Sequence, residues 1–186
     1  IGAEFEKFDK SNKKIFSLNL ANSFKDKKNH NLPSKTKLDQ TMSDIVGKFS
    51  YTALENFSFG YNFSLDNNLR TSNYDSVYSE VKYNNFITNF NFISENNEIG
   101  TKEIFTNSSK VIFNEEKELA FNLAKDLKND FTEYYNLIYQ YKTDCLVASV
   151  EYKKEFYKDD TLIPSKNLFL TFKFIPFADI RSSGIN

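Results

Sequence analysis

Residues 57–65 read Phe-Ser-Phe-Gly-Tyr-Asn-Phe-Ser-Leu, a strict alternation of apolar and small or polar residues. Successive side chains on a β-strand point to opposite faces, so this stretch predicts a strand with one apolar face and one polar face. The same period of two recurs along most of the chain, most clearly at 16–21, 134–141, 146–153 and 168–174. The repeat predicts an all-β protein.

Extended outward from that stretch, the alternation predicts an antiparallel meander of about eleven strands. Each is about ten residues long, which is the length that a tilted membrane-spanning strand needs. The expected strands are 1–8, 13–24, 43–53, 56–66, 73–83, 86–94, 101–113, 117–127, 132–142, 145–157 and 166–176.

Segment 114–128 fits two structures. Leu119, Leu123 and Leu127 have the i, i+4, i+8 spacing of an amphipathic helix, which Asn114 could cap. In a strand, the same leucines would share one face. The strands expected on both sides favour a strand here, because a helix would leave backbone edges of a closed barrel unpaired in lipid.

The predicted connections alternate in length. Short connections are expected at 9–12, 54–55, 84–85, 114–116 and 143–144. Longer ones are expected at 25–42, 67–72, 95–100 and 158–165, whereas 128–131 is short. Outer-membrane barrels place short turns on the periplasmic side and longer loops outside, so this rhythm favours a transmembrane β-barrel over a soluble sandwich.

The composition excludes several classes of protein. The 186 residues include 20 Phe and 11 Tyr but only 3 Pro and 5 Gly, which argues against disorder. A net charge of −1 removes the electrostatic basis for nucleic-acid binding. No apolar run is long enough for a transmembrane helix. Because the chain begins at Ile1 and no signal peptide is visible, we expect a fragment or a processed piece.

The residues that catalysis or metal binding needs are scarce. His30 is the single histidine and is expected in a solvated loop, and Cys145 is the single cysteine. Neither a catalytic triad nor a nitrogen- or sulfur-ligated metal site can be assembled from them, so we expect no enzyme activity and no cofactor. Cys145 has two interpretations: a small hydrophobe at a strand end, or one half of a disulfide to a part of the protein outside this chain.

An ordered series of motifs near the C-terminal end carries a family resemblance. The series is Tyr141-Lys-Thr-Asp-Cys-Leu, then Tyr152 and Phe156, then Asp159-Asp160, then Pro164-Ser165 and a closing strand through Phe174. It resembles the end of the LptD, or organic solvent tolerance, family of lipopolysaccharide-assembly outer-membrane proteins. Leu38-Asp39 and the segment 43–51 resemble the family's loop-to-strand region. The resemblance covers most of the chain from about residue 38.

The resemblance implies that residues 1–177 are the C-terminal part of a large transmembrane β-barrel in the outer membrane, followed by a tail at 178–186. The implied function is a translocon component that inserts lipopolysaccharide into the outer leaflet, without bond chemistry. The implied partners are lipopolysaccharide, the plug lipoprotein LptE and the periplasmic lipopolysaccharide-transport bridge. The alternatives are a porin-like channel, for which 25–42 is the candidate inward-folded loop, and a soluble all-β binding module.

The resemblance also implies roles for particular residues. The last strand would meet the first strand of the barrel at a lateral seam through Leu168, Leu170, Phe172 and Phe174. The polar residues expected to face the aqueous lumen are Glu151, Lys153, Glu155 and Lys173. Glu151, Lys153 and Glu155 suit a solvent-exposed face equally well. Cys145 would match the family's C-terminal cysteine, which pairs with a cysteine of the N-terminal domain. Many members carry two adjacent cysteines there, whereas Leu146 follows Cys145 here.

Overall fold

A computed structural model describes residues 1–32, 34, 36–97, 100–157, 163–175 and 178–181. These residues form twelve β-strands and contain no helix. The strands are β1 (Gly2–Phe8), β2 (Lys14–Ala21), β3 (Ile45–Leu54), β4 (Phe57–Leu65), β5 (Ser72–Tyr83), β6 (Phe86–Asn97), β7 (Gly100–Ile112), β8 (Lys117–Asp126), β9 (Phe131–Lys142), β10 (Leu146–Glu155), β11 (Ser165–Phe174) and β12 (Ala178–Arg181).

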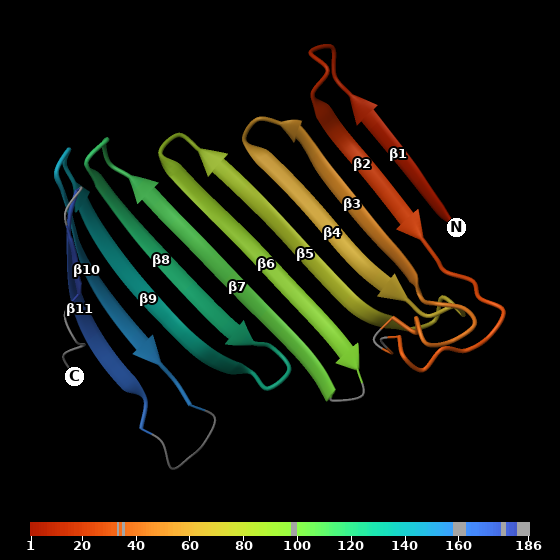
Figure 1. The fold of residues 1–186 in the computed structure, drawn as a ribbon. Helices are drawn as coiled ribbons and strands as arrows, with labels where there is room; N and C mark the ends of the chain where they lie inside the picture. Colours follow the sequence, from red (N-terminus) through yellow and green to blue (C-terminus); the bar gives the residue numbers. More distant parts are fainter. Residues whose placement is uncertain (33, 35, 98–99, 158–162, 176–177, 182–186) are drawn as a thin grey trace. The chain divides into compact units, whose positions relative to one another are not determined.

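Each strand is hydrogen-bonded to the next in one sheet of order β1 to β12 (Figure 1). The predicted all-β antiparallel meander is therefore confirmed. Within segment 114–128, residues Lys117–Asp126 form a strand, β8, which pairs in antiparallel register with β9. β12 pairs with the last four residues of β11. It lies within the expected tail and is not predicted from the sequence. Four residues are too few to show an alternation.

The chain divides into two compact units. The N-terminal unit comprises Ile1–Val81 and Asn91–Ile104, and the C-terminal unit comprises Lys82–Phe90 and Phe105–Asn186. Tight turns join several hairpins in both units. Asn12, Asn84 and Asp130 adopt positive φ angles of 62°, 51° and 48° in these turns, a conformation that Asn and Asp tolerate better than most residues.

A ladder of aromatic rings crosses one face of the N-terminal unit. Phe16 contacts Phe5 and Phe49 edge to face, with ring centroids 5.7 and 5.1 Å apart, and Phe49 contacts Phe59 at 5.8 Å. The rings come from β1, β2, β3 and β4. Edge-to-face pairs of this kind each contribute about 0.5–1.5 kcal/mol beyond the area that they bury, so the ladder ties four strands together.

Two strand glycines provide space for aromatic rings. A Cβ atom at Gly47 would lie 2.1 Å from the ring of Phe63, its cross-strand partner on β4. A Cβ atom at Gly60 would lie 1.9 Å from the ring of Tyr78 on β5. Each ring therefore covers the backbone of the opposite glycine, an arrangement that pins the register between neighbouring strands.

Burial in this sheet is inverted relative to a globular protein. Among the described residues, Ala124 is the one buried hydrophobic residue. The buried polar residues are Ser17, Ser43, Asp44, Ser64, Ser76, Thr88 and Asn136. A soluble domain buries its large apolar side chains in a core, whereas most of those in this chain remain partly or largely exposed.

Candidate functional site

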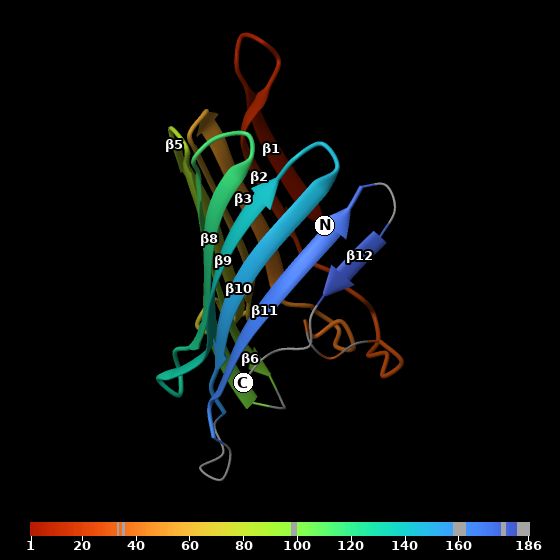
Figure 2. The ribbon, with the colours of Figure 1, turned by 90° about the vertical axis from the view of Figure 1, so that its left-hand side faces the viewer.

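β8, β9, β10 and β11 lie side by side in the C-terminal unit (Figure 2). Their register gives the unit a continuous apolar face. The register places on it Leu119, Phe121, Leu123, Tyr135, Leu137, Tyr139, Val150, Tyr152, Leu168, Leu170, Phe172 and Phe174. Leu137, Val150 and Phe172 are 44%, 41% and 42% exposed. A contiguous apolar surface of this kind marks contact with a membrane or with another protein. We call it the C-terminal apolar face.

The four residues predicted at a lateral seam, Leu168, Leu170, Phe172 and Phe174, all lie on this face of β11. β12 pairs with β11 from Thr171 to Phe174, so this part of the outer edge of β11 already has a neighbour. The seam itself remains a prediction.

The opposite face of the same strands carries a polar network. Asn122 donates to Asn136 over 2.8 Å, and Asn136 donates to Glu151 over 2.8 Å. Lys153 and Glu155 form an ion pair of 2.7 Å. The register brings all four predicted lumen residues, Glu151, Lys153, Glu155 and Lys173, to this face. Their exposure to an aqueous lumen is still a prediction.

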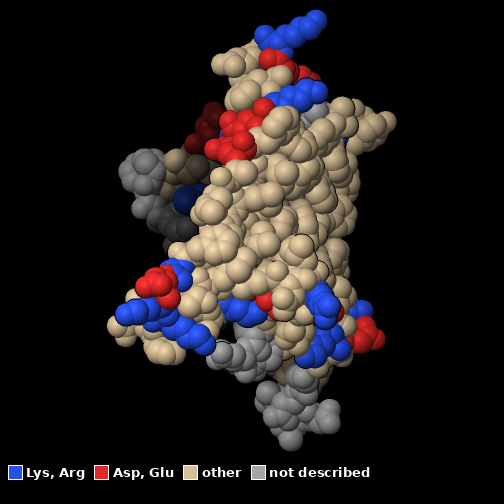
Figure 3. Space-filling view, turned by 90° about the vertical axis from the view of Figure 1, so that its right-hand side faces the viewer, with Lys and Arg blue, Asp and Glu red and all other residues tan. Residues whose placement is uncertain are grey.

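Charged side chains are unevenly distributed on the side of the molecule drawn in Figure 3. Figure 3 shows one side of the molecule, where Lys, Arg, Asp and Glu gather toward two ends of the view and leave the broad surface between them uncharged. An uncharged band between charged ends is typical of a surface that contacts hydrocarbon.

Cys145 is exposed and lies in the turn between β9 and β10 rather than within a strand. The backbone N–H of Thr143 donates to the carbonyl of Leu146 over 2.7 Å, and its hydroxyl oxygen accepts from the N–H of Leu146 over 3.1 Å. The Cys145 carbonyl accepts from Ile175 at the end of β11 over 2.9 Å. The turn is therefore held by backbone and side-chain hydrogen bonds, and its cysteine is exposed. A disulfide to a part of the protein outside this chain remains a prediction.

The long connection 22–44, which we call the strap, is fixed to the N-terminal unit by a buried carboxylate. Asp44 is fully buried, and its Oδ2 accepts from Asn73 Nδ2 over 2.7 Å and from Ser64 Oγ over 3.2 Å. Lys37 Nζ lies 3.6 Å from Asp44 Oδ1 and donates to Asp66 Oδ1 over 2.8 Å. One lysine of the strap therefore connects two carboxylates at the ends of β3 and β4.

Backbone contacts complete this anchor. The Asp44 N–H donates to the carbonyl of Thr36 over 2.9 Å, and Asn22 Nδ2 donates to the carbonyl of Ser43 over 2.7 Å. Lys37 itself has a positive φ of 52°. The surroundings hold this residue in an unfavourable conformation, which indicates that the anchor determines the path of the strap.

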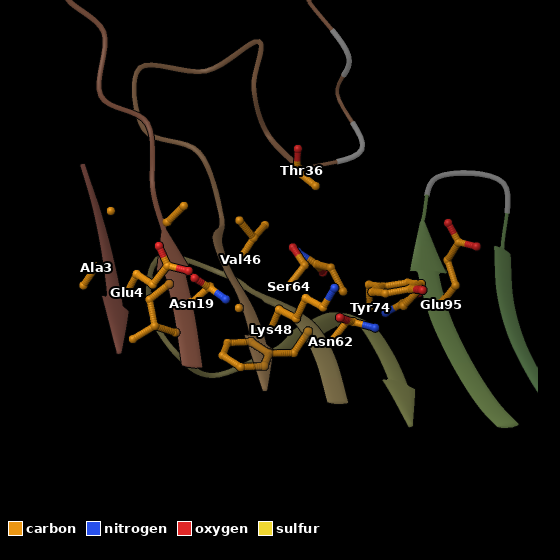
Figure 4. A pocket seen from close by; sticks show the side chains of 17 residues that line it. Ala3, Glu4, Asn19, Thr36, Val46, Lys48, Asn62, Ser64, Tyr74 and Glu95 are labelled. Carbon is orange, nitrogen blue, oxygen red and sulfur yellow. The ribbon is translucent and has the colours of Figure 1, made fainter. Parts of the chain in front are cut away.

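A pocket of about 850 Å³ lies beside the anchor in the N-terminal unit. Its lining residues come from β1 to β6 and from the strap. Figure 4 shows the strand side chains on one side of the pocket and Thr36 of the strap on the opposite side. The row Glu4, Asn19, Lys48 and Asn62 runs straight across β1 to β4, because each is the cross-strand partner of the next. The strap therefore bends over the polar face of the N-terminal unit.

The anchor is not evident in the sequence. The alternation predicts strands that include residues 22–24 and 43–44, and a loop at 25–42. His30 is exposed in the strap, as expected for such a loop. Asp159 and Asp160, part of the family resemblance, lie outside the described residues. Within the described part of the chain, no three His, Cys, Asp or Glu side chains lie together as a metal site requires.

The anchor predicts a pH window for the strap. Donation from Lys37 lowers the pKa of Asp66 below 3.8 and raises the pKa of Lys37 above 10.5. The depressed Asp66 pKa stabilises the fold above pH 3.8, and this stability is lost as the pH falls through the lowered value. The raised Lys37 pKa stabilises the fold below pH 10.5, and this stability is lost as the pH rises through the raised value.

We therefore expect hydrogen exchange in residues 22–44, corrected for the intrinsic rate, to be slowest at intermediate pH. It should become faster in acid, where Asp66 is protonated, and in alkali, where Lys37 loses its proton. Pulse labelling followed by mass spectrometry measures the exchange rate. In Lys37→Met, which lacks the ion pair with Asp66, the dependence of this rate on acid and on alkaline pH should disappear. Equal protection of the strap at pH 2.5 and pH 6 in the unmodified chain contradicts this expectation.

The described residues contain no helix that is long and apolar enough to cross a membrane. Comparison with protein-family models gives no match to this chain. Comparison with curated proteins also gives none.

Proposed function

We propose that the chain forms part of the wall of an outer-membrane β-barrel, with its apolar faces toward lipid and its polar faces toward an aqueous interior. The observation that carries this proposal is the inverted burial: small polar side chains are covered, and large apolar side chains are exposed. Water disfavours that arrangement, whereas a bilayer around a wet lumen favours it. β4, β10 and β11, with 9, 10 and 10 residues, also have the length of membrane-spanning strands.

We further propose that this barrel inserts lipopolysaccharide into the outer leaflet of the outer membrane. The support is the ordered resemblance of residues 141–176 to the LptD family, together with the exposed position of Cys145 in a turn. In this proposal β11 borders the lateral seam, and Glu151, Lys153, Glu155 and Lys173 line the interior. LptE and the periplasmic bridge would be partners, and no bond would be made or broken.

A porin-like channel is the second candidate, and one observation favours it. Such channels carry a loop that folds inward over the polar face. The strap places Thr36 over the polar-face pocket of the N-terminal unit and is anchored there by Asp44 and Lys37. In a channel, the strap would narrow the pore.

The test of the membrane placement uses the absence of tryptophan from the chain. Tyr139→Trp places a single tryptophan on the C-terminal apolar face, and Gln140→Trp places one on the opposite face of the same strand. In bicelles containing brominated acyl chains, we expect strong quenching at position 139 and weak quenching at position 140. Acrylamide in the water should quench in the opposite order.

Equal quenching at the two positions would contradict the membrane placement and favour a soluble all-β module. The two membrane functions are then separated in cells that depend on the protein containing this chain. Its depletion should reduce lipopolysaccharide at the cell surface if it is a translocon. A channel should instead give ion conductance in planar bilayers that increases when the strap is released by Lys37→Met.

A further inference from the structure

Two lysines face each other at one end of the C-terminal apolar face. Lys154 on β10 and Lys166 on β11 are direct cross-strand partners. The Cβ atoms of such partners lie about 4.5–5.5 Å apart, and like charges directly opposite are unfavourable. No ion pair joins either ammonium group to a described residue. Among the described residues, the pair therefore has two positive charges and no ion-pair partner.

The two acidic residues described nearby, Glu155 and Glu133, do not form ion pairs with these lysines. Glu155 points to the opposite face and is paired with Lys153. Glu133 shares the apolar face of β9 but forms no ion pair with Lys154 or Lys166 among the described contacts.

Aromatic rings lie beside Lys154 instead. Lys154 Nζ lies 4.4 Å from the ring centroid of Phe156, and that ring lies 5.9 Å from the ring of Tyr135, the partner of Lys154 on β9. Aromatic rings and lysine head groups are the residues that occupy the boundary between hydrocarbon and water.

The apolar face continues directly from the lysines along the same two strands. The next cross-strand pairs are Tyr152 with Leu168, Val150 with Leu170, and Ala148 with Phe172. Six residues of a strand span about 20 Å, which exceeds the roughly 15 Å of hydrocarbon in one leaflet. The β10–β11 hairpin therefore presents a cationic head site followed by an apolar strip as long as an acyl chain.

We propose that Lys154 and Lys166 bind the phosphate headgroup of an anionic lipid, whose acyl chains lie along the apolar strip of β10 and β11. A phosphate between the two ammonium groups offsets their repulsion and accepts charge-assisted hydrogen bonds from both. This inference rests on the proposed contact of the C-terminal apolar face with lipid.

Native mass spectrometry of the chain in neutral detergent micelles tests the headgroup. With dioleoyl phosphatidic acid and dioleoyl phosphatidylcholine as probes, we expect about tenfold tighter retention of the phosphatidic acid. Lys154→Gln/Lys166→Gln should remove the preference, and Lys154→Arg/Lys166→Arg should retain it. Lys27→Gln/Lys28→Gln in the strap changes the net charge equally and should leave it unchanged.

Three results would overturn the site: equal retention of the two lipids, the same loss in the Lys27/Lys28 control, or displacement of phosphatidic acid by an equal concentration of inorganic phosphate. The last would assign a phosphate site without a lipid. Circular dichroism of each variant verifies that the sheet is intact. Quenching of the tryptophan at position 139 by brominated lipid distinguishes failure of this site from failure of the membrane placement.

Discussion

Replacing Leu137 by arginine is expected to destabilise the lipid-embedded sheet by about 2–4 kcal/mol. Leu137 lies near the middle of β9 on the C-terminal apolar face, between Phe121 on β8 and Tyr152 on β10. It is 44% exposed, so arginine meets no steric barrier. The expected loss comes from placing a guanidinium group in hydrocarbon. Urea unfolding of the chain in bicelles, followed by circular dichroism, measures it.

Ile138→Arg is the matched control, because it makes an apolar-to-arginine change one residue away at the same depth. Its cross-strand partners are Ala120 and Glu151, on the polar face. We expect a change within about 0.5 kcal/mol, since an arginine there meets water and the Glu151 carboxylate. Similar losses for the two variants would mean that both faces meet the same environment, which contradicts a barrel wall.

The sequence predicts that Leu137 and Ile138 lie on opposite faces of a strand, because side-chain alternation is a local property. The stretch 57–65 predicted β4 to within a residue, and the neighbouring strands followed from the same pattern. The ambiguity at 114–128 also has a local cause. The leucine spacing fits a helix and a strand equally, and the pairing of β8 with β9 also shifts register between Ala124 and Lys125. Such an irregularity interrupts the alternation that would identify a strand.

The strap anchor could not be predicted in the same way. It joins Lys37, Asp44, Asp66 and Asn73, which meet because β3, β4 and β5 end near one another. Nothing in one sequence distinguishes Asp44 from the exposed Asp26 of the same loop. The Lys154–Lys166 pair could not be predicted from the sequence either, because it depends on the register of β10 against β11.

Replacing Asp44 by alanine is expected to release the strap from the N-terminal unit. The change removes the acceptor of Asn73 and Ser64 and one of the two carboxylates that hold Lys37. Ser64 is buried and Asn73 is half-buried. A buried donor left without an acceptor costs about 1–3 kcal/mol and a half-buried one costs less, so we expect a total loss of about 2–4 kcal/mol. Lys27 and Lys28 are exposed trypsin sites in the strap, and cleavage there should become at least about tenfold faster.

Asp26→Ala is the control for this prediction, because Asp26 is exposed in the same loop and the substitution is identical. It should leave both the stability and the cleavage rate unchanged. Asp44→Asn separates the two contributions of the carboxylate. It keeps an oxygen for Asn73 and Ser64 but removes the charge that faces Lys37, so an intermediate cleavage rate is expected. Unchanged cleavage in Asp44→Ala would show that backbone contacts alone hold the strap, and the strap could then not open a pore by losing this ion pair.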